Sequence, residues 1–141
     1  LTREGWHVAV ATNQSGLARG LFEMATLNAI HAKMHKAVAA AGGRIEAVFY
    51  CPHSSEMHCA CRKPRAGMLH EIAARYGCDL KGVPSVGDSL RDLQAAVSVG
   101  ARPLLVKTGK GERTLAAGGL PQDTLVFDDL AAAAEHVLAA A

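Results

Sequence analysis

Short apolar segments alternate with helix-like segments along the whole chain. The 141 residues are enough for one domain. Strand-like runs cover residues 6–11, 45–50, 83–86, 104–107 and 124–127, and helix-like segments cover residues 26–41, 66–76, 90–99, 112–117 and 130–140. Such alternation is typical of parallel βαβ units. We therefore predict an α/β fold built on a doubly wound, parallel, Rossmann-like sheet.

Composition and charge narrow the classes of function. Fifteen Lys and Arg against 13 Asp and Glu give a net charge of +2, which offers no electrostatic case for binding nucleic acid or a membrane surface. No apolar run approaches the roughly 20 residues of a membrane span, and no signal-peptide pattern opens the chain. Four Cys, three of them within 11 residues, favour metal binding in a reducing compartment. We expect a cytoplasmic protein.

Cysteine and histidine spacing predicts a metal site between residues 51 and 61. A Cys-x-His pair is followed, after five intervening residues, by a Cys-x-Cys pair. Three thiolates and one imidazole suit a closed tetrahedral zinc site, which is structural because it keeps no open position. The expected ligands are Cys51, His53, Cys59 and Cys61. The alternative is a set of unconnected reduced thiols, with His53 at the surface. His58 is a competing ligand, and we expect Cys78 to be a partly buried thiol.

Polar residues follow the first three predicted strands, at the carboxyl ends where parallel sheets bind their ligands. Those after the second strand are Cys51 and His53, described above. After the first strand, the hydroxyl of Thr12 and the N–H groups of the following turn suit an oxyanion. After the third, Asp88 offers hard oxygen ligands for Mg²⁺, and Asp92 opens the next helix. Arg62 and Lys63 follow the last expected zinc ligand. The alternatives are an ordinary polar turn, a solvated basic pair and, for Asp92, helix N-terminal electrostatics.

The order of these motifs resembles motifs two, three and four of the haloacid dehalogenase superfamily of phosphotransferases. They are Thr-Asn at residues 12–13, Lys-Pro at 63–64 and Gly-Asp-Ser-x-x-Asp at 87–92. The Cys-x-His…Cys-x-Cys-Arg-Lys-Pro segment is similar to the small zinc-containing branch of that superfamily. The resemblance runs from about residue 6 to residue 138. It implies a phosphatase without a large cap domain, with Mg²⁺ as catalytic and Zn²⁺ as structural metal.

The resemblance also implies a role for each site residue. Thr12 would hold the transferring phosphoryl group, and Lys63 would neutralise charge on the nucleophile and the phosphate. Asp88 would bind Mg²⁺, with Asp92 as a weaker, indirect second acidic residue. Arg62 would reach the distal part of the substrate. The remaining residues of the phosphate pocket would be Asn13, Gln14 and Ser15.

One motif of that superfamily is missing from these residues. The nucleophilic Asp-x-Asp of the first strand occurs nowhere in the 141 residues, and Asp128 and Asp129 are adjacent rather than spaced. In the superfamily this strand is central in the sheet, between the strands that correspond to residues 6–11 and 83–86. We expect residues 1–141 to be one phosphatase domain truncated at its N-terminus. These residues alone are expected to be inactive and unstable.

Two loops indicate the class of substrate. The turn at residues 16–22 and the Thr-Gly-Lys-Gly segment at residues 108–111 resemble the members of the branch that act on heptose. The expected reaction is hydrolysis of the 7-phosphate of heptose 1,7-bisphosphate through an aspartyl-phosphate, on the way to lipopolysaccharide precursors. Histidinol phosphate is the alternative substrate. A non-catalytic, zinc-stabilised binding module is the alternative of another class. We expect a monomer whose partner is a small phosphorylated sugar.

Overall fold

The computed structural model describes residues 1–141, which form two compact units, Leu1–Arg62 (unit 1) and Lys63–Ala141 (unit 2). The elements of unit 1 are η1 (Thr2–Glu4), β1 (Ala9–Asn13), α1 (Met24–Ala40), β2 (Ala47–Cys51) and η2 (Ser55–Met57). The elements of unit 2 are α2 (Gly67–Tyr76), β3 (Pro84–Gly87), α3 (Leu90–Ser98), β4 (Arg102–Val106), α4 (Gly111–Ala117), β5 (Leu125–Phe127) and α5 (Leu130–Ala140). None of the helices has the length and apolar character needed to cross a membrane.

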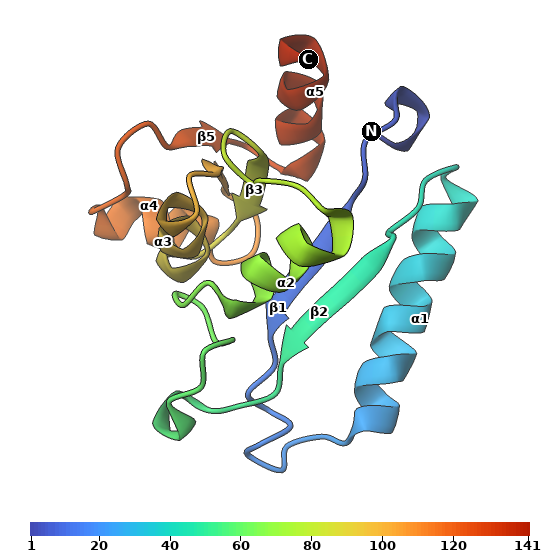
Figure 1. The fold of residues 1–141 in the computed structure, drawn as a ribbon, viewed down its shortest axis with the longest axis vertical. Coiled ribbons are helices and arrows are strands. Elements are labelled where there is room, and N and C mark those ends of the chain that lie inside the picture. The colour runs from blue at the N-terminus through green and yellow to red at the C-terminus, as the bar shows by residue number, and fades with distance from the viewer. The chain divides into compact units, whose positions relative to one another are not determined.

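Unit 1 is a βαβ unit, with α1 as the crossover between two parallel strands (Figure 1). Leu27 is the buried residue of α1, and the ring of His31, one turn further along the helix, lies 6.4 Å from the ring of Tyr50 on β2. Ile30, which the helical spacing assigns to the same apolar stripe, is 56% exposed. The buried stripe is therefore narrower than the sequence predicts.

The position of β1 corrects the predicted strand at residues 6–11. The strand begins at Ala9 and includes Thr12 and Asn13, which the sequence places in the following turn. The reason is the parallel ladder, which runs from Ala9 opposite Ala47 to Asn13 opposite Cys51. Because β2 extends to Cys51, β1 gains two polar residues at its carboxyl end. The backbones of Asn13 and Cys51 are thereby held side by side.

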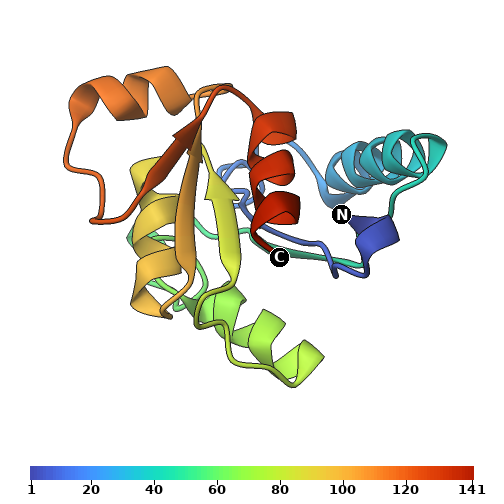
Figure 2. The same ribbon diagram turned by 90° about the horizontal axis from the view of Figure 1, so that it is seen from above.

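Unit 2 is a three-stranded parallel sheet in the order β3-β4-β5. β4 is central, and its residues Pro103 to Val106 are buried, as expected of a parallel strand covered on both faces. Figure 2 shows α3 and α5 on opposite faces of this sheet. Small buried residues, Ala95 and Ala96 of α3 and Ala133 of α5, allow close packing. The predicted doubly wound arrangement is confirmed here.

The five strands form two parallel sheets rather than one. β1 and β2 form one sheet, and β3, β4 and β5 form the other. No ladder joins β1 or β2 to β3. The α/β class and the parallel pairing are confirmed. The expectation that a further strand completes a single sheet stays a prediction, as does the extent of the domain.

Candidate active site and metal centre

The Cys and His residues singled out by their spacing gather into one cluster in unit 1. The ligand atoms of Cys51, His53, Cys59 and Cys61 all lie within 4.8 Å of one another. The Sγ atom of Cys51 lies 2.9 Å from that of Cys61 and 3.5 Å from that of Cys59, and Nδ1 of His53 lies 3.2 Å from Sγ of Cys61. A tetrahedral zinc ion holds two thiolate sulfurs about 3.8 Å apart. The donor set and its clustering therefore fit zinc, although the sulfurs lie closer together than a bound ion would hold them.

The protonation of the cluster also favours a bound cation. Burial opposes the Cys59 thiolate, but hydrogen bonds from the backbone of Arg62 and from the neighbouring ligands outweigh it and lower the pKa of Cys59 to about 6. Burial and the adjacent thiols raise the pKa of Cys61 to about 12. Three thiols in such close contact repel one another once they ionise, and a divalent cation removes that repulsion.

Two other candidates fall outside the cluster. His58, the competing ligand, is not among the clustered groups; it ends the short helix η2 in a left-handed conformation, with φ of 51°. Cys78 is exposed rather than partly buried, since it lies just beyond the C-terminal cap of α2. The prediction for Cys78 is therefore wrong.

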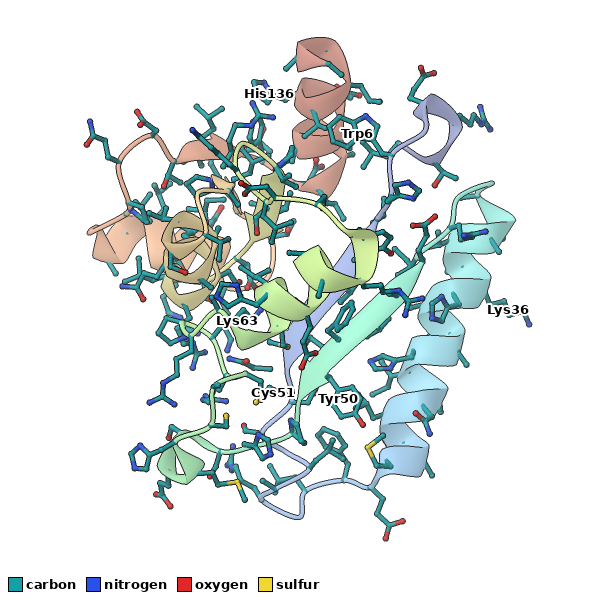
Figure 3. The ribbon with its side chains drawn as sticks, in the orientation of Figure 1. Trp6, Lys36, Tyr50, Cys51, Lys63 and His136 are labelled. Carbon is teal, nitrogen blue, oxygen red and sulfur yellow. The ribbon has the colours of Figure 1, made fainter.

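The turn after β1 is tied to the start of the metal loop. The N–H of Gln14 donates to the carbonyl of Cys51 at 2.7 Å, and the N–H of Ala18 donates to the carbonyl of Pro52 at 3.2 Å. On the far side of the loop, the Arg62 guanidinium reaches the carbonyl of His53 at 3.5 Å. An ordered metal loop would thus hold the turn in place. Figure 3 marks Cys51 at the end of β2, where this connection begins.

This turn has the features of an oxyanion site. The Gln14 amide donates to the Thr12 hydroxyl at 3.0 Å, which orients that hydroxyl. The N–H groups of Ser15 and Gly16 donate to no protein acceptor in a half-buried turn. Consecutive N–H groups of this kind attract anions. Gly16 is required for packing, because a Cβ there would lie 2.2 Å from the ring of Phe22.

Beside the turn, unit 1 has an open groove of about 690 Å³. It is lined by Leu17, Ala18, Gly20, Phe22, Glu23, Met24, Tyr50, Pro52, His53 and Met57. The groove therefore joins the turn after β1, the end of β2 and the metal loop. Part of this lining, from Leu17 to Phe22, lies in the turn that the sequence linked to the substrate. The lining residues Met24, Tyr50 and Met57 were not singled out, because they share no spacing pattern.

In unit 2, Lys63 and Asp92 form an ion pair. The Nζ atom of Lys63 lies 2.5 Å from Oδ1 of Asp92, and the two side chains are 15% and 16% exposed. The other oxygen of Asp92 accepts the N–H groups of Asp88 and Ser89 at 3.1 and 3.2 Å. Burial opposes ionisation, but Lys63 and the bonds from Ser89 outweigh it, so the pKa of Asp92 is lowered. Asp92 thus holds Lys63 and also closes the capping box of α3.

Asp88 lies directly after β3, where its carboxylate is held by backbone from another loop. Its Oδ2 accepts the N–H of Lys110 at 2.9 Å, while Oδ1 has no protein partner. Gly87 allows the approach of Asp92, because a Cβ on Gly87 would lie 2.3 Å from Cβ of Asp92. A half-buried carboxylate with one oxygen fixed and one available fits Mg²⁺, which binds one or two carboxylates and completes its shell with water and phosphate.

The structure thus brings the predicted residues together in two groups. Unit 1 holds the residues of the phosphate turn and the metal loop: Thr12, Asn13, Gln14, Ser15, Cys51, His53, Cys59, Cys61 and Arg62. Unit 2 holds Lys63, Asp88 and Asp92. The convergence of the two groups on one ligand stays a prediction. The partners of Asp88 were missed, because Lys110 acts through its backbone and leaves no signal in the sequence.

Comparison with known proteins shows the family of this chain. A family model described as HAD-hydrolase-like matches residues 60–133, and one described as polynucleotide kinase 3 phosphatase matches residues 1–90. The D-glycero-beta-D-manno-heptose-1,7-bisphosphate 7-phosphatase of Bordetella bronchiseptica is 62% identical over 98% of this chain and 77% of that protein. The chain belongs to this family of HAD-like hydrolases. The family resemblance found in the sequence is confirmed.

Two further comparisons agree with this membership. The enzyme of the same name from Pseudomonas putida is 56% identical over 98% of the chain and 78% of its own length. A crystal structure of the B. bronchiseptica D,D-heptose 1,7-bisphosphate phosphatase, in complex with magnesium and phosphate, has a TM-score of 0.97 to this chain. The match covers 100% of this chain and 79% of the chain in that crystal structure. The HAD-like α/β fold is therefore shown.

Proposed function

We propose that this protein is a phosphatase that removes the 7-phosphate of D-glycero-D-manno-heptose 1,7-bisphosphate. The observation that carries the proposal is the 62% identity to an enzyme of that name, which spans nearly the whole chain. The geometry supports it, because unit 1 offers a turn suited to an anion. Unit 2 offers Lys63, held by Asp92, and a separate carboxylate, that of Asp88, suited to Mg²⁺. The reaction supplies precursors of lipopolysaccharide in the cytoplasm, and the protein acts as a monomer.

Each group has a distinct task in the proposed reaction. The Thr12 hydroxyl and the N–H groups of Ser15 and Gly16 bind oxygens of the 7-phosphate, with Asn13 and Gln14 lining the pocket. Lys63, oriented by Asp92, stabilises negative charge on the equatorial oxygens. Arg62 reaches the distal part of the substrate. Asp88 holds Mg²⁺, which supplies electrostatic stabilisation of the transferring phosphoryl group.

The zinc site has no direct task in this reaction. Four protein ligands, Cys51, His53, Cys59 and Cys61, fill the coordination shell of Zn²⁺ and leave no position for water or substrate. We propose that the ion orders the loop that follows β2. The loop in turn fixes the turn after β1 through the carbonyls of Cys51 and Pro52.

The proposed mechanism passes through an aspartyl-phosphate. The 141 residues contain no Asp-x-Asp to form it, so we propose that these residues alone are inactive. Assays therefore use the intact protein. A non-catalytic binding module is disfavoured, because the relatives that match nearly the whole chain are named as phosphatases.

The test is phosphate release by the intact protein from heptose 1,7-bisphosphate and from histidinol phosphate. We expect a higher kcat/KM on the heptose ester, and a loss on the order of 10²-fold or more in Lys63→Met, because one preorganised donor to the transition state is removed. Lys36→Met is the matched control, since Lys36 is exposed on α1 and points away from it (Figure 3). Preference for histidinol phosphate, or an unchanged rate in Lys63→Met, would contradict the proposal.

A further inference from the structure

Asp88 is fixed at three separate points within unit 2. Its N–H donates to Oδ2 of Asp92, and its own Oδ2 accepts the N–H of Lys110. Its backbone carbonyl accepts the hydroxyl of Thr114 at 2.7 Å, across 26 residues of sequence. The first contact belongs to the start of α3. The other two come from the loop between β4 and α4 and from α4 itself, which carry no motif that points to Asp88.

The hydroxyl of Thr114 has one preferred acceptor. It lies 3.1 Å from the carbonyl of Lys110, but that carbonyl already accepts the N–H of Thr114 at 3.0 Å. The carbonyl of Asp88 is nearer. A hydroxyl has a single proton to donate, so it serves Asp88. This bond links α4 to the backbone of the residue proposed to bind Mg²⁺.

The loop before α4 is shaped for close approach to the carboxylate. Gly109 has a φ of +60°, and a Cβ there would lie 2.3 Å from Oδ2 of Asp88. Gly111, where α4 begins, would place a Cβ 1.7 Å from the carbonyl oxygen of Val106. A side chain at Gly109 would displace the carboxylate of Asp88, and one at Gly111 would clash with the backbone of Val106. The backbone at Lys110 can therefore reach the carboxylate only because both neighbours are glycine.

We infer that Thr114 is a positioning residue for the proposed magnesium site. Its hydroxyl fixes the backbone of Asp88, and the Lys110 N–H takes Oδ2, so that Oδ1 is left to face a divalent cation. This inference rests on the proposed function, because that function assigns the cation to Asp88. Residues that orient a metal ligand from outside the coordination shell typically change metal affinity by about 10- to 100-fold when they are replaced.

The experiment compares three variants of the intact protein with the wild type. Thr114→Val removes the hydroxyl and keeps the shape, and Thr114→Ser restores the hydroxyl. Thr124→Val is the matched control, because the Thr124 hydroxyl also donates to a backbone carbonyl at 2.7 Å, that of Pro121, and does not contact Asp88. Two readouts are taken: Mn²⁺ affinity without sugar, from a titration of Mn²⁺ alone, and the Mg²⁺ and sugar-ester concentrations for half-maximal phosphate release.

We expect Thr114→Val to weaken Mn²⁺ binding, and to raise the Mg²⁺ requirement, by about 10-fold or more. The KM for the sugar ester stays unchanged, and Thr114→Ser and Thr124→Val bind Mn²⁺ like the wild type. Wild-type Mn²⁺ affinity in Thr114→Val, or equal losses in Thr114→Val and Thr114→Ser, would overturn the inference. Thr114→Ala replaces Thr114→Val if the latter does not fold. A wild type that binds Mn²⁺ but cleaves neither ester refutes the proposed function, and the Mn²⁺ affinities still decide the role of Thr114.

Discussion

At the scale of single residues, the ion pair with Asp92 fixes the position of Lys63, as the phosphate role proposed for this lysine requires. A lysine has a flexible stem, so its position must be set by a partner. Asp92 provides that partner, while its second oxygen accepts two backbone N–H groups at the start of α3. One carboxylate therefore serves both the helix and the lysine. The helix N-terminal role weighed for Asp92 from the sequence is confirmed by the capping box of α3, and its indirect role toward Mg²⁺ stays a prediction.

The same pair predicts a pH-dependent stability. The pKa of Asp92 is lowered in the folded protein, so its carboxylate stabilises the fold above its ordinary pKa of about 3.9. That stabilisation is lost as the pH falls from there through the folded pKa. We expect Asp92→Asn to cost about 2 kcal/mol in free energy of unfolding at pH 7, the size of a hydrogen bond to a charged group. The difference from wild type then shrinks as the pH falls below about 3.9.

Urea unfolding of the intact protein at a series of pH values measures this difference. Asp128→Asn is the control, because the Asp128 carboxylate pairs with Lys107 at 3.1 Å while its side chain is 85% exposed. Exposed pairs contribute little, so this variant should follow the wild type. A difference between Asp92→Asn and wild type that stays constant down to pH 3 would be evidence against the role given to Asp92.

At the scale of elements, the metal loop depends on its ligands for order. Residues 52–62 contain only the short helix η2 and bury little apolar surface. Binding of a metal by residues up to ten positions apart closes the loop and offsets its loss of conformational entropy. The loop then supports the turn after β1 through two backbone hydrogen bonds.

Loss of one ligand should therefore release both the zinc and the loop. We expect Cys59→Ser to lose most of its bound zinc and to become sensitive to trypsin at Arg62, because the loop is no longer closed by the metal. Cys78→Ser is the matched control, since Cys78 is exposed and outside the cluster. Elemental analysis and timed proteolysis measure both effects. Full zinc content in Cys59→Ser would show that the ligand set is wrong.

The sequence predicts the elements better than it predicts their ends. Helices closed by glycine were placed to within a residue or two, as with α2 before Gly77. β1 was misplaced, because its end is set by pairing with β2, which lies outside its own sequence neighbourhood. The metal cluster was predictable, since four ligands of distinctive type lie close in sequence. The partners of Asp88 were not, because Thr114 and the N–H of Lys110 act through contacts that composition does not encode.

At the scale of the whole molecule, the residues proposed to act on the substrate belong to two different units. Thr12 and the N–H groups after it belong to unit 1 and form the turn proposed to bind the phosphate. Lys63, the proposed cationic group, and Asp88, the proposed magnesium ligand, belong to unit 2. Neither group alone accounts for a phosphatase. Membership of the heptose-bisphosphate phosphatase family is the reason to propose that both act on one phosphate.

A crystal structure of the intact protein with Mg²⁺ and inorganic phosphate tests this proposal most directly. The account predicts one phosphate that accepts hydrogen bonds from the Thr12 hydroxyl and the Lys63 ammonium, with Asp88 bound through Oδ1 to a magnesium ion that shares that phosphate. A phosphate bound by Thr12 alone, or a magnesium ion bound without Asp88, would contradict it.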